Sequence, residues 1–318
     1  MSDLATLVRV SRLYYELGET QEAIAAVVGV TRPQVSRLLK EARAQGVVEI
    51  RIVDRSAVES EAGEALRRRF GLRAVHVAPT LDGPAELTRR RVGRLAGEVL
   101  RSALRDGMVV GIGDGATISS VADELVANAA AAGPGSGTQI DATVVPLCGG
   151  FWRPGSGDEP FRRIGDAVGA SVHALHAPGL LDDPVVRDGL CAHAGVRAVV
   201  DLWARLDVAL LGIGAPAWSE ASVGAEAMAE IEAGHAVGEV LIAPFDADGR
   251  LVAPSLRART VAFDAGALPE VPLAIGVAEG GSKVSPILGA LRGRLIDVLV
   301  TDERTADAVL DLALRSAA

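Results

Sequence analysis

The sequence contains little lysine, few cysteines and few aromatic residues. Lys40 and Lys283 are the only lysines among 32 basic residues, and this excess of arginine points to a coding bias. The two cysteines, Cys148 and Cys191, are too few for the disulfide framework of a small secreted domain, and they lack Cys-x-x-Cys spacing. A reducing compartment therefore suits the chain, and we expect it in the cytoplasm.

The chain also lacks an excess of positive charge and a long apolar segment. Its formal net charge of −9 excludes a protein whose whole surface coats nucleic acid or an anionic membrane. No apolar run approaches the ~20 residues of a membrane-spanning helix, and the first residues lack the pattern of a signal peptide. With 318 residues, we expect about two domains and no membrane partner.

Residues 1–55 have the pattern of a compact helical domain. After a first apolar-periodic segment, Thr20 is placed to cap a second helix that ends at Gly29. Thr31 is placed to cap a third helix, with Gln34 at the reciprocal position of a capping box. Two capped helices joined by a glycine turn form a helix-turn-helix, whose second helix enters the major groove of DNA.

The third helix concentrates positive charge in an acidic protein, with four basic side chains against one acidic between residues 31 and 44. Arginine and lysine donate to guanine and phosphate, glutamine pairs with adenine, and serine bonds to base or backbone. The residues that we expect to contact DNA are Arg32, Gln34, Ser36, Arg37 and Lys40. A helical scaffold with a solvated basic face is the alternative. The alternating segment 47–52 is expected to return as a wing.

A helical connector is expected at 56–71, followed by a second domain at 72–318. In that domain short apolar strands alternate with alanine-rich helices, which is typical of an α/β fold with a mostly parallel sheet. We expect strands at 74–77, 108–112, 142–146, 208–213, 273–277 and 298–301. Helices are expected at 86–104, 118–130, 192–202, 283–291 and 305–314, and a loop at 132–138.

A glycine-rich turn, Gly-Ile-Gly-Asp-Gly at 111–115, follows the second of these strands. Glycines let a ligand approach the backbone, and the N–H groups at the following helix start favour an anion or a sugar oxygen. A dinucleotide site would show GxGxxG with an acidic residue about 20 positions later, whereas the spacing here is GxGxG. From the residues alone, a tight turn without a ligand stays open as well.

Motifs along nearly the whole chain resemble one known family. They include VSRLLKEA at 35–42, GIGDGAT at 111–117, VVPLCGG at 144–150, FDADG at 245–249 and GGSK at 280–283. These segments are similar to the SorC-type (sorbitol-operon) family of sugar-responsive bacterial transcriptional regulators. The resemblance implies an effector domain similar in fold to sugar-phosphate isomerases and deaminases. It also implies double-stranded operator DNA and a sugar, polyol or sugar phosphate as partners, a homodimer or homotetramer, and no cofactor.

The resemblance assigns effector binding to ten residues: Gly113, Asp114, Gly115, Ala116, Thr117, Cys148, Gly149, Glu239, Asp246 and Lys283. Two of them depart from the family pattern. Asp114 stands where members commonly carry an aromatic or neutral residue, and Cys148 where phosphosugar-sensing members can carry arginine. A carboxylate repels a phosphate dianion but suits the adjacent hydroxyls of a polyol. We therefore expect an unphosphorylated sugar or polyol as the effector.

An enzyme is the first alternative, because the fold relatives act on sugar phosphates. Asp114, Glu239 or Lys283 could serve as acid or base. The helix-turn-helix is explained only if the output is transcription, so we expect a regulator without catalytic activity. In that regulator the effector shifts the quaternary arrangement and thereby the operator affinity.

A metal-sensing regulator is the second alternative. The pairs His173/His176 and Cys191/His193 have spacings that could supply metal ligands. The intervening segment separates the two pairs, and no carboxylate cluster accompanies them. We expect no metal site.

Overall fold

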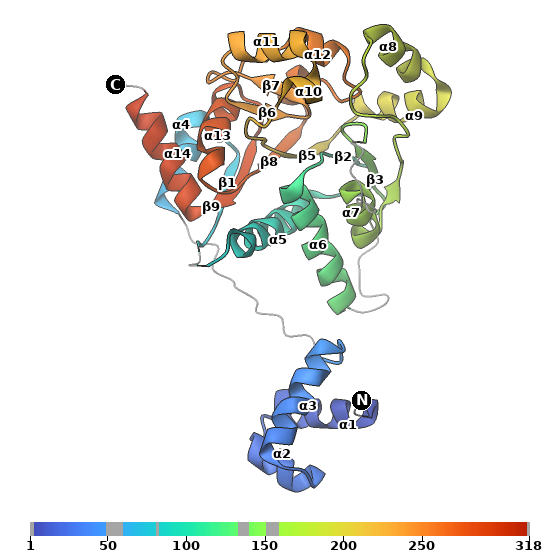
Figure 1. Ribbon diagram of the computed structural model, residues 1–318, viewed down its shortest axis with the longest axis vertical. Coiled ribbons are helices and arrows are strands. Elements are labelled where there is room, and N and C mark those ends of the chain that lie inside the picture. Colours follow the sequence, from blue (N-terminus) through green and yellow to red (C-terminus); the bar gives the residue numbers. More distant parts are fainter. Residues whose placement is uncertain (1–2, 49–59, 81–82, 133–139, 151–158, 317–318) are drawn as a thin grey trace. The chain divides into compact units, whose positions relative to one another are not determined.

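The computed structural model describes residues 3–48, 60–80, 83–132, 140–150 and 159–316. The chain divides into two compact units, Met1–Arg55 and Ser56–Ala318 (Figure 1). Residues 49–52 of the expected wing at 47–52 lie outside the described residues. Residues 133–138 of the expected loop at 132–138 lie outside them as well.

Helices make up the described part of the first unit. They are α1 Leu4–Ser11, the π-helical segment η1 Arg12–Glu16, α2 Gln21–Val28 and α3 Arg32–Ala44. Thr20 caps α2, since its hydroxyl oxygen accepts a hydrogen bond from Ala23 N at 3.2 Å. Gly29 ends α2 at a φ of 75°, a left-handed conformation that favours glycine. The buried side chains at the centre of the unit come from α1, α2 and α3: Leu7, Val10, Ile24, Ala25, Val35, Leu39 and Ala42.

Seven parallel strands form the sheet of the second unit, in the order β1-β9-β8-β5-β2-β3-β4. They are β1 Ala74–Ala78, β2 Val109–Ile112, β3 Thr143–Pro146, β4 Ser171–Val172, β5 Val208–Gly212, β8 Leu273–Val277 and β9 Val298–Asp302. The six predicted strands are all present, and the mostly parallel α/β fold is confirmed. The chain runs outward through β2, β3 and β4 and then returns to β5 on the other side of β2. The strand order therefore reverses between β2 and β5.

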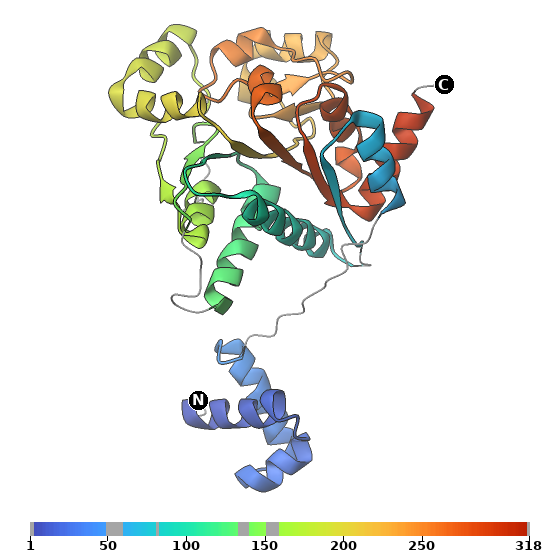
Figure 2. The same cartoon turned by 180° about the vertical axis from the view of Figure 1, so that it is seen from behind.

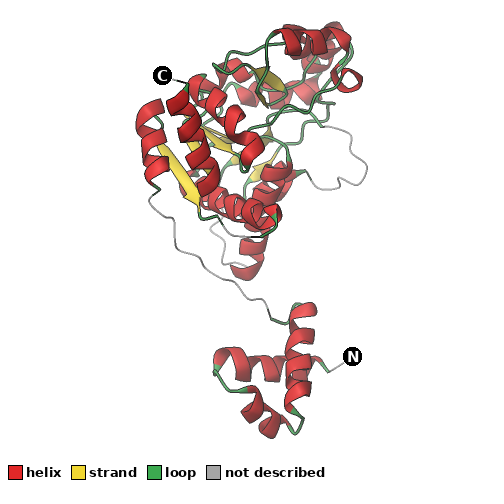
Figure 3. Cartoon of the chain, turned by 60° about the vertical axis from the view of Figure 1, so that its left-hand side comes forward, coloured by secondary structure: helices red, strands yellow, loops and turns green. Residues whose placement is uncertain are grey.

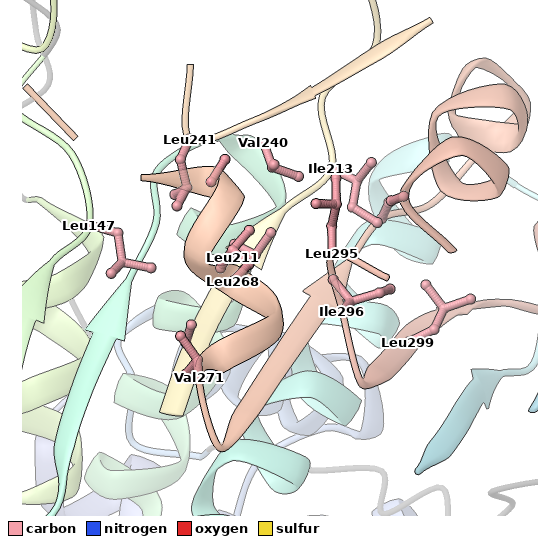
Figure 4. Packing of buried hydrophobic residues seen from close by; sticks show 14 of the residues in the cluster. Leu147, Leu211, Ile213, Val240, Leu241, Leu268, Val271, Leu295, Ile296 and Leu299 are labelled. Atoms are coloured by element: carbon pink, nitrogen blue, oxygen red, sulfur yellow. The ribbon is translucent and has the colours of Figure 1, made fainter. Parts of the chain in front are cut away.

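Helices cover both faces of this sheet (Figure 3). Apolar side chains of α5 Ala85–Ala103, α6 Ala116–Ala132 and α7 Pro160–Val168 pack on one face. On the other face lie side chains of α4 Glu61–Phe70, α9 Ala194–Trp203, α13 Val284–Arg292 and α14 Glu303–Arg315. Val109 and Val110 contribute to opposite faces, as the two-residue period of a strand requires. Figure 4 shows the second core, where Leu211 of β5 lies near Leu268 and Leu299 of β9 lies nearer Ile296.

The segment expected as a connector is part of the α/β unit from Glu61 onward. Helix α4 packs against β1 and α14, and Figure 2 shows α4 and α14 side by side. Its Ala62 and Leu66 are buried in the core of the unit. Ser60 caps the helix by accepting from Gly63 N at 3.1 Å. The charged residues that marked this segment as a connector occupy the outer face of an amphipathic helix.

The sequence pattern did not predict several short elements of the second unit. They are α8 Pro184–Ala192, α10 Glu220–Val223, α11 Ala225–Ala233, the antiparallel hairpin β6 Gly238–Val240 and β7 Ala243–Phe245, α12 Pro254–Ala258, η2 Ala265–Glu270 and η3 Gly281–Lys283. The helix expected at 192–202 is α9, and His193 separates it from α8. The hairpin matters for the site because it carries Glu239.

Helices α5 and α6 approach closely at Gly93, where a β-carbon would lie 2.7 Å from the Ser120 hydroxyl and 2.9 Å from its carbonyl carbon. We predict that Gly93→Ala lowers the free energy of unfolding of the α/β unit by about 1–3 kcal/mol, because backbone must move. Gly189 of α8 has nothing within 4 Å of such a carbon. As a matched control, Gly189→Ala should be neutral or stabilise by up to about 1 kcal/mol. Urea unfolding of both variants tests the pair, and equal effects would contradict it.

Candidate DNA-binding helix and effector site

Helix α3 presents its predicted reading residues to solvent. Arg32, Gln34, Arg37 and Lys40 are exposed, and Ser36 is half-buried. Within the described part of the unit, no carboxylate forms an ion pair with the three cations. Their charges are thus available to phosphates and base edges.

Gln34 has a second role that bears on base recognition. Its Oε1 accepts a hydrogen bond from Thr31 N at 2.8 Å and another from the Thr31 hydroxyl at 3.0 Å. Bidentate pairing with adenine would need the same oxygen as acceptor. The Gln34 side chain therefore caps the start of α3. It could pair with adenine in this way only after its hydrogen bonds to Thr31 break.

The proposed ligand loop lies where the strand order of the sheet reverses. Gly113 follows β2, and its N–H donates to Leu210 O of β5 at 2.8 Å. Asp114 turns back on the loop, since its Oδ1 accepts from Gly115 N at 2.7 Å. Ala116 and Thr117 then open helix α6. In doubly wound sheets, ligands bind outside the carboxyl ends of the strands at such a reversal point.

Glu239 reaches the same place from the β6–β7 hairpin. Its backbone exchanges two hydrogen bonds with Gly214 at the end of β5, at 2.8 and 3.1 Å. Gly214 is needed there because a β-carbon would lie 2.3 Å from Glu239 Cγ. Trp218 Nε1 donates to the carboxylate at 2.9 Å. Burial raises the pKa of Glu239, although this hydrogen bond and nearby Lys283 act in the opposite direction.

Lys283 stands half-buried between η3 and α13, beside two carboxylates. Burial lowers the pKa of its ammonium group, and the charges of Glu279 and Glu239 oppose that shift. A cation at a helix start is unfavourable for the helix dipole, so these carboxylates compensate for its position. Glu279 was not among the predicted site residues, because no sequence motif marks it. Its position just after β8 brings its carboxylate within hydrogen-bond distance of the Thr117 hydroxyl.

Cys148 borders the same cluster at the end of β3. Burial, together with the charges of Asp114 and Glu239, raises the pKa of its thiol to about 12. The thiol is therefore neutral at physiological pH and is a weak hydrogen-bonding group. Glu239 of the β6–β7 hairpin and Glu279 after β8 thus lie near Lys283, and Asp114 after β2 lies near Cys148, an arrangement that offers several acceptors to hydroxyl groups.

The comparisons with known proteins agree over both units. Residues 55–311 match the Sugar-bind family, described as a sugar-binding domain, and residues 3–68 match a Crp-like helix-turn-helix domain. The sorbitol operon regulator of Klebsiella pneumoniae is 31% identical over 97% of this chain and 98% of its own length. The chain belongs to the SorC family. It is therefore a DNA-binding transcriptional regulator with a sugar effector, as the sequence predicted.

Other SorC-family relatives extend over the same length. The transcriptional regulator LsrR of an Enterobacter species is 33% identical over 96% of this chain and 92% of its own. A deoxyribonucleoside regulator of Bacillus subtilis is 27% identical over 96% of both. The crystal structure of the full-length sorbitol operon regulator SorC from Klebsiella pneumoniae has a TM-score of 0.74 at 30% identity. That match covers 98% of this chain and 99% of that chain.

Two of the ten residues that the SorC resemblance assigned to the effector serve the fold. The carboxylate of Asp246 accepts from Asp248 N at 2.9 Å and from Arg250 N at 2.8 Å, so it closes its own turn. Gly149 permits a close backbone approach, because a β-carbon there would lie 2.6 Å from the carbonyl oxygens of Ala177 and Pro178. A role of either residue in effector binding stays a prediction.

Among the described residues, no group of three or more His, Cys, Asp or Glu side chains could hold a metal ion. His193 Nδ1 instead accepts from Gly195 N at 3.4 Å and caps α9.

In the described part of the chain, no helix is both long and apolar enough to cross a membrane.

The cap at Gln34 leads to a prediction that separates its two roles. Gln34→Ala should speed hydrogen exchange at the first amides of α3 by several-fold, because the reciprocal cap contributes about 0.5–1 kcal/mol. Gln34→Glu retains an acceptor and should keep the protection of the native chain. Exchange measured by mass spectrometry on the full chain tests this. Unchanged exchange in Gln34→Ala would show that the cap is not needed.

Proposed function

We propose that the effector of this regulator is an unphosphorylated sugar or polyol that binds where β2, β5 and β8 end. The charge of the site carries the proposal. Glu239 and Glu279 lie near Lys283, Asp114 and Glu239 lie near Cys148, and the neighbouring cation Arg89 is already paired with Glu279 at 2.9 Å. A phosphate dianion entering this site would meet more negative than positive charge, whereas hydroxyl groups would find acceptors.

We further propose that the protein is a cytoplasmic homodimer or homotetramer without catalytic activity. Paired helix-turn-helix units would read two operator half-sites, with Arg32, Ser36, Arg37 and Lys40 facing DNA and Gln34 holding the start of the helix. Effector binding would favour one quaternary arrangement and so change the spacing of the units. Turnover of a sugar phosphate in a steady-state assay would contradict this proposal.

The effector class can be tested with matched ligands. We predict that D-sorbitol or another free polyol or sugar raises the melting temperature of the full chain and changes its operator affinity in a gel shift. The 6-phosphate of the same compound should do so at least tenfold more weakly. A phosphosugar that binds more tightly than all free compounds in the screen would overturn the proposal.

The two lysines should separate the two functions. Lys283→Met should weaken effector binding by tenfold or more, because a half-buried cation and hydrogen-bond donor is lost from the pocket. Its operator affinity without effector should stay unchanged. Lys40→Met should show the reverse pattern, with weaker DNA binding and a smaller salt dependence. Calorimetry and gel shifts on both variants test this, and normal induction of Lys283→Met would remove that residue from the site.

A further inference from the structure

Glu279 is a buried carboxylate that links three parts of the effector unit. It follows β8, and its side chain is only 9% exposed. Arg89 Nε of helix α5 donates to its Oε1 at 2.9 Å, and the Thr117 hydroxyl at the start of α6 donates to its Oε2 at 2.9 Å. Lys283 lies close enough for the charge of Glu279 to oppose the effect of burial on the lysine.

These contacts place a fixed negative charge where a bound anion would otherwise be favoured. A helix start with a hydroxyl donor, an arginine and a lysine is the usual composition of a phosphate site. Here Glu279 already takes the hydrogen bonds of Thr117 and Arg89. Arg89 Nη1 also donates to Glu86 Oε2 at 3.0 Å, and the Glu86 side chain is 61% exposed. Glu86 is therefore screened by solvent and neutralises the arginine less effectively.

We propose that Glu279 is a specificity-determining residue that excludes phosphorylated effectors by acting as an internal anion beside Arg89, Thr117 and Lys283. This inference rests on the proposed binding of an uncharged sugar or polyol at the same site. It assigns the rejection of phosphate to one carboxylate on β8, rather than to Asp114 alone. It also explains why two cations in the pocket do not make it a phosphate site.

The proposal predicts a gain of function on removal of one charge. Glutamine at position 279 keeps the size and can still accept from Arg89, while its amide can donate to the Thr117 oxygen. Glu279→Gln would remove the more buried of the two carboxylates paired with Arg89 and one of the two carboxylates near Lys283. Inorganic phosphate and D-sorbitol 6-phosphate should then bind at least tenfold more tightly than to the native chain, and added salt should reduce the gain.

Isothermal titration of the full chain with these two anions tests the proposal. Glu86→Gln is the matched control, because it removes the exposed carboxylate that contacts the same arginine, and its affinity should stay within twofold of the native value. The double variant Arg89→Gln/Glu279→Gln should lose most of the gain. Operator binding without effector checks that each variant is folded, and Glu279→Ala replaces the glutamine variant if that variant is unstable.

Three results would overturn the proposal. They are equal anion affinity in Glu279→Gln and the native chain, an equal gain in Glu86→Gln, and a gain that survives the loss of Arg89. A purely structural role would lower the melting temperature without improving anion binding, and so would give the first of these results. If no uncharged effector is found but Glu279→Gln still gains phosphate binding, the proposed function fails while the role of Glu279 in rejecting anions stands.

Discussion

The effector site depends on one constraint, which is that every strand of the large sheet runs parallel. Parallel strands bring their carboxyl ends to the same edge, so residues distant in sequence meet without any local motif. Asp114 follows β2, Cys148 follows β3 and Glu279 follows β8. The strand order reverses between β2 and β5, and the β6–β7 hairpin brings Glu239 to Gly214 there.

Charge is distributed in a way that suits the two tasks. Residues 1–55 hold eight basic and seven acidic side chains, and the remainder of the chain carries the net negative charge. The acidic effector unit discourages nonspecific contact with DNA, so attraction is concentrated on α3. In the effector unit, negative charge also acts at short range, on Lys283. The carboxylates offset the dipole penalty at Lys283 and oppose the loss of its charge on burial.

Features with a local signal could be predicted from the sequence, whereas features made by tertiary contact could not. The caps at Thr20 and Thr31 and the six longer strands follow from periodicity and side-chain chemistry. The β6–β7 hairpin escaped prediction because Leu241 and Ile242 form its turn at φ values of 49° and 65°, where glycine or asparagine is usual. Glu279 escaped because no spacing marks it.

The central claim is that effector binding and operator binding are linked through one protein. Linkage is reciprocal, so the factor by which the effector changes operator affinity must equal the factor by which operator DNA changes effector affinity. Calorimetric titration of the effector into the full chain, with and without saturating operator duplex, measures this directly. We expect effector dissociation constants that differ by the factor found in gel shifts. Identical effector dissociation constants with and without operator DNA would show that the two sites are not linked.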